Sequence, residues 1–317
     1  MPPKVQAKQK KKSGSGAPAL QRVGIVVKHH HPEAAQLALQ LGSLLLSRGC
    51  EVLFADESAR VHETFLKSHS KQKDRIRSLP KPKLVDLCDL IVVLGGDGTF
   101  LSIARLMRSR SVPLMGVNMG QLGFLTEVKK SEAAASLSAL LDGAPPVVSE
   151  RALLEVTLKR QNKIIFQGPV VNDAVISKGA IARIIGVQIA VGGRRVHDVR
   201  ADGIIVSTPT GSTAYSLAAG GPIIEPSLPA VVLTPICPHS LTQRPRVIPD
   251  HAEIELQLSQ RPGHVLLTLD GQDAVDMNED DVVTVRKFRK HQLKLISSPT
   301  RDYFSLLREK LKFGMRD

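Results

Sequence analysis

A glycine-rich segment that contains one carboxylate offers the clearest chemistry in the chain. The apolar run 90–94 leads into Gly95-Gly96-Asp97-Gly98-Thr99, and a helix is expected from Phe100 to Met107. Glycines let a backbone turn sharply and approach a ligand closely, and the free N–H groups at a helix start attract phosphate. A carboxylate there repels phosphate unless it serves the reaction, and Asp97 could accept a hydroxyl proton or hold a metal between phosphates. An equally weighted alternative is that Asp97 only caps the helix.

This loop differs from the two standard nucleotide-binding motifs. It lacks the lysine and hydroxyl residue that end a Walker A motif, and it lacks the G-x-G-x-x-G spacing of dinucleotide-binding folds. It is therefore a phosphate loop without its own lysine. A second glycine-bearing turn, 118–125, follows the next strand, so both loops lie at the carboxyl ends of strands, where open α/β sheets bind ligands. His29-His30-His31 could also contact a phosphate, although we expect a solvated loop there.

Two polar segments stand out in the second half of the chain. Asn172-Asp173 interrupts an apolar strand pattern, and adjacent strand side chains point to opposite faces, so at least one of the two faces inward or toward a cleft. Such a group needs a partner, for example a ribose hydroxyl or an amide, unless the pair marks a bulge or a turn at a strand end. Segment 207–216 holds six serines and threonines, a dense surface of small donors that could surround riboses, although its composition alone is that of a loop.

The pattern over 22–145 alternates short apolar strands with helices. Strands are expected at 23–27, 51–55, 90–94 and 114–118, with helices beginning at Pro32 and Ser131. Fully apolar strands that alternate with helices predict a doubly wound parallel sheet, a Rossmann-like α/β domain. Residues 56–83 are polar, lysine-rich and weakly periodic, and we expect them to form a mobile surface excursion.

After Pro145-Pro146 the chain becomes rich in β-runs separated by turn signals. Gln161-Asn162 lies between two such runs, as in a hairpin, and we expect a mainly antiparallel, sandwich-like domain. Asp302 to Phe313 has the pattern of an amphipathic helix with Phe304, Leu307 and Leu311 on one stripe. The predicted organisation is a disordered basic tail (1–19), an α/β domain (20–147) completed by the C-terminal segment 293–317, and a β-rich domain (148–292).

Composition narrows the classes of function. The 317 residues are 42% hydrophobic, which excludes a wholly disordered chain, and 3% aromatic with no tryptophan, which disfavours stacking of single-stranded bases. The formal net charge of +13 favours anionic small molecules, phosphates or nucleic acid. Three cysteines at no metal-ligand spacing indicate reduced thiols and a cytoplasmic protein, and no apolar run is long enough to cross a membrane.

Taken in order, these segments resemble the NAD kinase family. The resemblance covers about 22–313 and includes 95–99, 118–125, Asn172-Asp173, 207–215, 235–241, 270–272 and the terminal helix. The Gly-Gly-Asp-Gly loop alone is shared with diacylglycerol, sphingosine and phosphofructo-kinases, whereas the whole series is specific. The resemblance implies the NAD kinase/diacylglycerol kinase-like fold, in which an α/β domain precedes a β-rich domain.

The resemblance also implies an activity: a transferase in which the 2′-hydroxyl of the adenosine ribose of NAD attacks the terminal phosphate of ATP or polyphosphate, giving NADP. By position, Asp97 is the proton acceptor, and Mg²⁺ or another divalent metal is carried mainly by the phosphates. An arginine at position 200 resembles members that prefer NAD and ATP over NADH and polyphosphate. Substrate or nucleotide contacts are implied at Gly98, Phe100, Asn172, Asp173, Arg183, Arg200, Asp202, Thr210, Thr213, Ala214, Tyr215, Ser216, Leu217, Ala218 and Gln272.

Family members are dimers or tetramers whose β domains pack together, so a homodimer or homotetramer is implied, with Arg200 able to reach a neighbour's ligand. Two rival functions remain. A lipid or diacylglycerol-type kinase would share the glycine loop but should lack segment 207–216. A basic nucleic-acid-binding module would use the tail and residues 67–83, but it leaves the glycine and hydroxyl motifs without a purpose.

Overall fold

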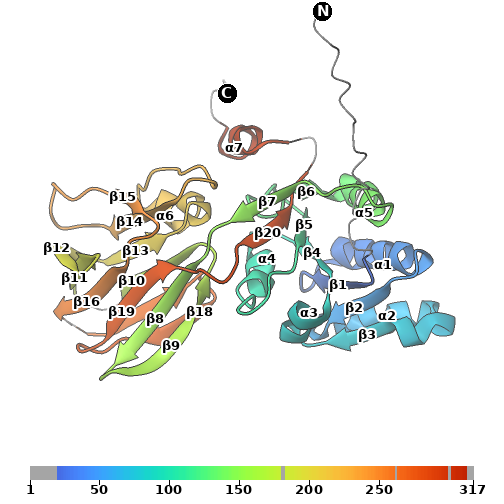
Figure 1. Ribbon diagram of the computed structural model, residues 1–317, viewed down its shortest axis with the longest axis horizontal. Helices are drawn as coiled ribbons and strands as arrows, with labels where there is room; N and C mark the ends of the chain where they lie inside the picture. The colour runs from blue at the N-terminus through green and yellow to red at the C-terminus, as the bar shows by residue number, and fades with distance from the viewer. Residues whose placement is uncertain (1–19, 180–182, 261–262, 299–300, 313–317) are drawn as a thin grey trace, which may run out of the picture.

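The structure is a computed structural model that describes residues 20–179, 183–260, 263–298 and 301–312. The predicted basic tail and Phe313 lie outside the described residues. The chain forms two parts that lie side by side, an α/β part and a β-rich part (Figure 1). Among the described residues, no helix is both long enough and apolar enough to span a membrane.

One eight-stranded sheet forms the centre of the α/β part. Its order is β3-β2-β1-β4-β5-β20-β7, with β6 paired to β5, and the pairs among β1 to β6 are parallel. The strands are β1 (Arg22–Val27), β2 (Glu51–Ala55), β3 (Ile76–Leu79), β4 (Leu90–Gly95), β5 (Leu114–Asn118), β6 (Val128–Lys129), β7 (Val148–Arg151) and β20 (Leu293–Ile296). The doubly wound parallel sheet predicted from the sequence is confirmed.

The edge of this sheet is built by segments distant in sequence. β20 returns from the far end of the chain to lie parallel to β5, and β7 pairs antiparallel with β20. The predicted boundary at 148 therefore falls inside the first sheet, because β7 belongs to it. The four residues of β7 carry too little apolar pattern to reveal this pairing, which depends on a strand about 140 residues further along the chain.

Helices cover both faces of the sheet. Alternate strand side chains point to opposite faces, so Ile25 packs in the core beneath α1, α2 and α5, while Val26 packs in the core beneath α3 and α4. Both faces are thus removed from water, which explains why the central strands are apolar throughout. The helices are α1 (Pro32–Ser47), α2 (Ala59–Ser68), α3 (Lys81–Leu87), α4 (Asp97–Ala104) and α5 (Ala133–Leu141), with 3₁₀ turns at Asp56–Ser58, Ser70–Arg75 and Lys130–Glu132.

The expectation of a mobile excursion over 56–83 is wrong. This segment forms α2, β3 and the start of α3, and it is anchored by Phe65, which is fully buried. The Phe65 ring lies 5.3 Å from the Phe54 ring and packs so closely on α1 that a Cβ atom on Gly42 would lie 2.8 Å from it. A single aromatic anchor holds a mostly polar helix, and periodicity alone does not detect that arrangement.

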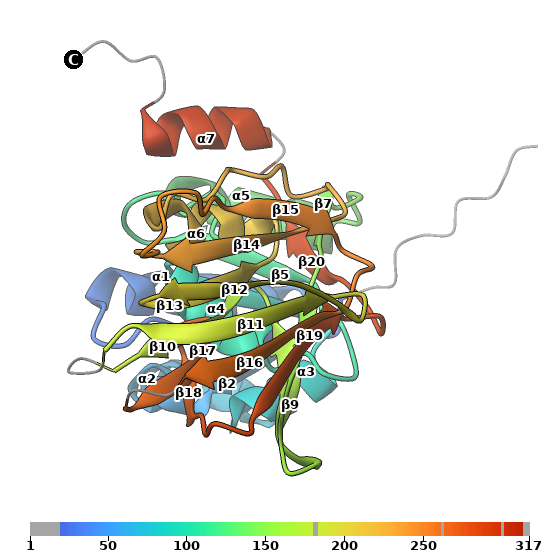
Figure 2. The ribbon, with the colours of Figure 1, turned by 90° about the vertical axis from the view of Figure 1, so that its left-hand side faces the viewer.

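Two six-stranded antiparallel sheets make up the β-rich part, and Figure 2 views the molecule from this side. Their orders are β15-β14-β13-β10-β17-β18 and β12-β11-β16-β19-β8-β9, and both contribute to one aliphatic core, which confirms the β-rich domain. Gln161 and Asn162 both have positive φ (47° and 62°), so the predicted hairpin turn is confirmed. The elements are β8 (Leu154–Arg160), β9 (Lys163–Val170), β10 (Asp173–Lys178), β11 (Ile185–Val191), β12 (Arg194–Ala201), β13 (Gly203–Ser207), a 3₁₀ turn (Thr210–Thr213), α6 (Tyr215–Ala218), β14 (Ala230–Ile236), β15 (Arg246–Pro249), β16 (Ile254–Gln260), β17 (Val265–Leu269), β18 (Asp273–Asp276) and β19 (Val282–Lys287).

A terminal helix, α7 (Tyr303–Leu311), follows β20 and lies above the region where the two parts meet (Figure 1). Its N-cap is Asp302, whose carboxylate accepts a hydrogen bond from the Ser305 N–H at 2.7 Å. Of the predicted apolar stripe, Leu307 and Leu311 are half-buried, but Phe304 is 59% exposed, and Leu306 is the buried side chain of the helix.

Replacing Phe65 with alanine should lower the free energy of unfolding by about 3–5 kcal/mol, because it leaves a cavity between α1 and α2. Urea unfolding followed by far-ultraviolet circular dichroism measures this effect. The matched control is Lys71→Ala, an exposed position in the same segment, which should change the free energy by less than about 0.5 kcal/mol. A loss below about 1 kcal/mol for the phenylalanine variant would contradict the anchoring role of Phe65.

Candidate functional site

Asp97 joins the two glycine-bearing loops. It is the first residue of α4, whose N-cap is Gly96, so its side chain does not cap the helix. Instead the carboxylate accepts hydrogen bonds from the backbone N–H groups of Phe124 (2.9 Å), Leu125 (3.1 Å) and Thr126 (3.2 Å), and from the Thr126 hydroxyl (3.1 Å). A Cβ atom on Gly123 would overlap Asp97 Oδ1, so the glycine is required for this close approach.

A lysine from the end of the chain also reaches Asp97. Lys310 of α7 places its Nζ 3.6 Å from Asp97 Oδ2 and 4.4 Å from the centre of the Phe124 ring. The ammonium group is therefore attracted both by the carboxylate and by the face of the aromatic ring. Sequence reasoning missed Lys310, because nothing in a terminal helix shows which of its lysines will meet a loop so far away in the chain.

Asn172 and Asp173 sit on a backbone that is held from two sides. On one side, Asp270 accepts hydrogen bonds from the N–H groups of Val171 (2.9 Å), Asn172 (2.7 Å) and Asp173 (3.1 Å). On the other side, the Thr208 N–H and hydroxyl donate to the carbonyls of Asn172 (2.8 Å) and Val171 (2.6 Å). The backbone that carries the two side chains is therefore held in place by the protein itself.

Asp270 is a second residue of the candidate site to which sequence reasoning gave no separate role. Its signal is the Asp270-Gly271 pair at the end of β17, where both residues have positive φ (51° and 62°). Such a turn aims the Asp270 carboxylate back at the neighbouring strand.

A pocket of about 340 Å³ opens beside these residues. It brings together the predicted residues Asn172 and Asp173 with Ala214 and Tyr215 from the other polar segment, and the Tyr215 side chain is 47% exposed. Predicted residue Gln272 immediately follows the lining residue Gly271. The remaining lining residues are Val175, Ser177, Thr268 and Asp270.

The pocket contains a buried pair of carboxyl groups. Burial, and then the neighbouring charge of Asp270, raises the pKa of Asp173 to about 7. Burial also raises the pKa of Asp270 above its usual value, although hydrogen bonds from the three backbone N–H groups oppose this rise. Because Asp270 has these donors and Asp173 has none from the described residues, the negative charge of the pair resides on Asp270 and the proton on Asp173.

Most hydroxyl groups of segment 207–216 bond within the protein. The Ser212 hydroxyl donates to the Pro209 carbonyl (2.6 Å), and the Ser216 hydroxyl lies 2.8 Å from the Thr234 hydroxyl. The prediction of a dense donor surface is therefore wrong for these residues: a compact turn needs the hydroxyls to satisfy its own polar groups. Thr210 Oγ1 is buried and has no hydrogen-bond partner in the described part of the chain.

The other residues predicted to contact a substrate or nucleotide differ in burial and in their place relative to the pocket. The Phe100 side chain is fully buried in the core beneath α4, because α4 turns it toward the sheet, so this side chain does not reach the surface where a ligand would bind. Gly98 borders open space. Arg183 and Arg200 are exposed and do not line the pocket. Outside the pocket lining, Asp202 pairs with Lys178 at 2.9 Å, and Thr213, Leu217 and Ala218 flank the lining residues.

Helix α4 holds the two halves of the site together. Arg105, just after α4, forms an ion pair with Asp273 of β18, and Leu101 shares a buried cluster with Val171, which directly precedes Asn172. Figure 1 shows α4 on the side of the first sheet that faces the β-rich part. The Asp97 loop and the Asn172–Asp173 pocket are thus parts of one packed unit.

The buried acid Asp173 should make stability depend on pH. The folded protein retains a proton on Asp173 up to about pH 7, whereas the unfolded chain releases it near pH 4, so stability falls as the pH rises through this window. Between pH 5 and pH 7 the free energy of unfolding should decrease by about 2–3 kcal/mol more in the wild type than in Asp173→Asn. Urea titrations at each pH measure the difference. The control is Asp142→Asn, which removes an exposed carboxylate paired with Arg48 and should retain the wild-type decline of the free energy of unfolding. Equal slopes for all three proteins would contradict the assignment of the proton to Asp173.

Comparison with known proteins matches both halves of the chain to one family. Its sequence models, described as the ATP-NAD kinase N-terminal and C-terminal domains, match residues 23–144 and 171–298. A protein of Geobacter metallireducens named NAD kinase is 48% identical over 234 residues, 74% of this chain and 82% of that protein. Another, from Syntrophotalea carbinolica, is 42% identical over 297 residues, 94% of this chain and all of the relative.

Solved structures agree with this result. The crystal structure of yeast NADH kinase complexed with NADH superposes with a TM-score of 0.85 at 27% identity, covering 94% of this chain and 89% of the yeast chain. An NAD kinase from Archaeoglobus fulgidus in complex with ATP shares the fold, with a TM-score of 0.69 at 24% identity, covering 91% of this chain and 99% of its own. The chain therefore belongs to the ATP-NAD kinase family.

Proposed function

We propose that this protein transfers the terminal phosphate of ATP to the 2′-hydroxyl of the adenosine ribose of NAD, which produces NADP. Family membership supports the reaction, and one structural observation carries its assignment to these residues. A carboxylate in a glycine-bearing loop is fixed, through α4, to a pocket whose polar residues suit a ribose. The rival function of a lipid kinase does not account for that pocket, and a nucleic-acid module would use neither feature.

Asp97 is the residue that we propose contacts the 2′-hydroxyl of NAD, which accepts the phosphate. A carboxylate is a weak base for a sugar alcohol, but phosphoryl transfer through a loose transition state needs little early proton removal. We propose that Asp97 orients the hydroxyl and accepts its proton late. Oδ1 already accepts three hydrogen bonds, whereas Oδ2 accepts one from Phe124 N and faces Lys310, so Oδ2 is the atom that receives the substrate hydroxyl.

The pocket around Asn172 and Asp173 is the proposed site for NAD. Asn172 offers an amide group, and Asp173 offers a carboxyl group that accepts hydrogen bonds from sugar hydroxyls. The half-exposed Tyr215 ring provides a surface for stacking. Over 203–243 the only formally charged residue is Glu225, so this wall does not repel the pyrophosphate of the dinucleotide.

We propose that the divalent metal arrives with the phosphate donor. Within the described residues, no three His, Cys, Asp or Glu side chains gather where they could hold a metal ion. Bound to the donor, Mg²⁺ would neutralise phosphate charge as the phosphoryl group moves.

We also propose that the protein forms a homodimer or homotetramer and acts in the cytoplasm. Arg183 and Arg200 are exposed and outside the lining of their own pocket, which suits contacts with the ligand of a neighbouring subunit. None of the three cysteines forms a disulfide, which suits a reducing compartment.

Asp97→Asn should lower the kcat for NADP formation by roughly a hundredfold or more, because the amide cannot accept the hydroxyl proton. Purified protein is incubated with NAD, Mg²⁺ and ATP, and NADP is then assayed; replacing ATP with polyphosphate in a parallel reaction identifies the donor. Thr126→Val is the matched control, because it removes one hydrogen bond to Asp97 and leaves the carboxylate in place. Turnover of the Asp97→Asn variant within about tenfold of the wild type would eliminate the proposed role.

Tyr215→Ala should raise the KM for NAD by about tenfold and leave the KM for ATP unchanged, because base and sugar lose a stacking surface. Tyr215→Phe keeps the ring and should behave like the wild type. Initial rates at saturating ATP measure the first quantity and rates at saturating NAD the second. A rise confined to the KM for ATP would place the dinucleotide elsewhere.

A further inference from the structure

The terminal helix brings a cation to Asp97. Lys310 of α7 has its Nζ 3.6 Å from Asp97 Oδ2 and 4.4 Å from the centre of the Phe124 ring. The glycine loop that carries Asp97 has no lysine of its own. The reaction proposed above uses Asp97 but leaves Lys310 without a role, although this lysine lies beside the oxygen that receives the substrate hydroxyl.

Contacts with both parts of the molecule hold α7 in this place. Just before the helix, Arg301 donates from Nη2 to the two carboxylate oxygens of Glu132 in the α/β part, at 2.7 and 2.8 Å. In the first turn, the Tyr303 hydroxyl donates to the Ile224 carbonyl of the β-rich part at 3.5 Å. The Leu306 side chain is buried. Because these contacts fix the helix backbone, the fold itself brings the ammonium group to the glycine loop.

The ammonium group of Lys310 is free to change its partner. Its distance of 3.6 Å from Asp97 Oδ2 is longer than a hydrogen bond. The Lys310 side chain is 33% exposed, and its charge is carried on a flexible four-carbon stem. The attraction between the two groups is therefore the weak one of a partly solvated ion pair. A rotation of the lysine side chain is enough to exchange Asp97 for another anion nearby.

The proposed reaction places such an anion within reach. A hydroxyl that donates a hydrogen bond to Asp97 Oδ2 lies about 2.7 Å from it, and the phosphorus that it attacks lies about 3–3.5 Å from the hydroxyl oxygen. The oxygens of the transferred group therefore come close to Lys310 Nζ, which needs only to turn about its own stem. A lysine binds phosphate as a point charge with three donors, so the ammonium group can follow these oxygens as they move.

We propose that Lys310 is a catalytic residue, whose ammonium group leaves Asp97 when the substrates bind and contacts the non-bridging oxygens of the phosphoryl group in transfer. The bond between the ribose 2′-oxygen and the terminal phosphorus of ATP forms, and the bond from that phosphorus to the bridging oxygen breaks, with its electron pair leaving on ADP. The hydroxyl proton passes to Asp97, while Lys310 stays protonated and stabilises the charge of the transition state. The inference rests on the proposed function and adds a residue to its chemistry.

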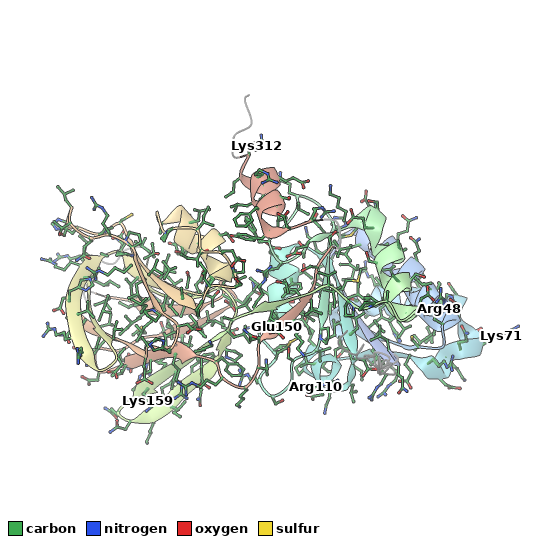
Figure 3. The ribbon with its side chains drawn as sticks, turned by 45° about the horizontal axis from the view of Figure 1, so that its top comes forward. Arg48, Lys71, Arg110, Glu150, Lys159 and Lys312 are labelled. Carbon is green, nitrogen blue, oxygen red and sulfur yellow. The ribbon has the colours of Figure 1, made fainter. Side chains whose placement is uncertain are left out.

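Lys310→Met tests the charge, because methionine keeps a long apolar side chain and removes the ammonium group. The kcat for NADP formation should fall by about a hundredfold, while the KM values for NAD and ATP stay within about threefold of the wild type, because the contact is strongest in the transition state. The matched control is Lys312→Met, which removes the same charge at the C-cap of α7 and should leave all three constants unchanged. Figure 3 shows Lys312 at the outer end of α7.

Rescue by a soluble amine separates a chemical role from a structural one. Ethylammonium should raise the kcat of Lys310→Ala by about tenfold, with saturation, because the small cation can take the place of the lost ammonium group at this partly exposed position. Tetramethylammonium at the same concentration has no N–H donor and should give no rescue. Neither salt should accelerate the wild type.

Three results for the variants would overturn the proposal. A kcat of Lys310→Met within about threefold of the wild type would remove the lysine from the chemistry. A kcat above that of the wild type would show that the ion pair with Asp97 inhibits the enzyme. A fall in kcat that ethylammonium does not restore in Lys310→Ala would assign the lysine a structural role. A wild-type protein that makes no NADP from NAD with either ATP or polyphosphate would instead refute the proposed function, and this inference with it.

Discussion

Tight loops expose backbone N–H groups that need acceptors, and in this protein two carboxylates supply them. Asp97 accepts from the backbone at Phe124 to Thr126, and Asp270 accepts from the backbone at Val171 to Asp173. The hydrogen bonds of Asp97 join two segments of the α/β part that are distant in sequence. Those of Asp270 do the same within the β-rich part. Removing either carboxylate would leave several buried donors unpaired, so the geometry of the site depends on these two side chains.

The same interactions divide the acidic groups by role. Asp270 receives backbone donors and carries its charge inside the protein. Burial, and then this neighbouring charge, raises the pKa of Asp173 to about 7. Asp97 is less enclosed, because its Oδ2 atom faces only the Lys310 side chain of α7 on that side. Asp270 thus supports the structure, and Asp173 responds to pH. Asp97 can release its contact with Lys310 and accept a substrate hydroxyl instead.

Helix α4 connects the Asp97 loop with the β-rich part. Arg105, just after α4, pairs with Asp273 of β18, and Leu101 of α4 shares a buried cluster with Val171, which precedes Asn172. The pocket around Asn172 and Tyr215 belongs to a segment with a single formal charge, Glu225, over 203–243. The carboxylate and this pocket are thereby held in a fixed arrangement by contacts within the protein.

The sequence by itself determined the parallel strands, the hairpin at Gln161-Asn162 and the family, because local periodicity, turn residues and ordered motifs depend on neighbouring positions. It also marked Asp97, Asn172 and Asp173 as candidate site residues. Only the tertiary structure decided that Phe65 anchors segment 56–83, that β7 joins the first sheet, and that Phe100 faces the core. It also decided that Lys310 meets Asp97 and that most hydroxyls of 207–216 bond inward. These outcomes depend on contacts between residues far apart in the chain, and such contacts leave no periodic signal.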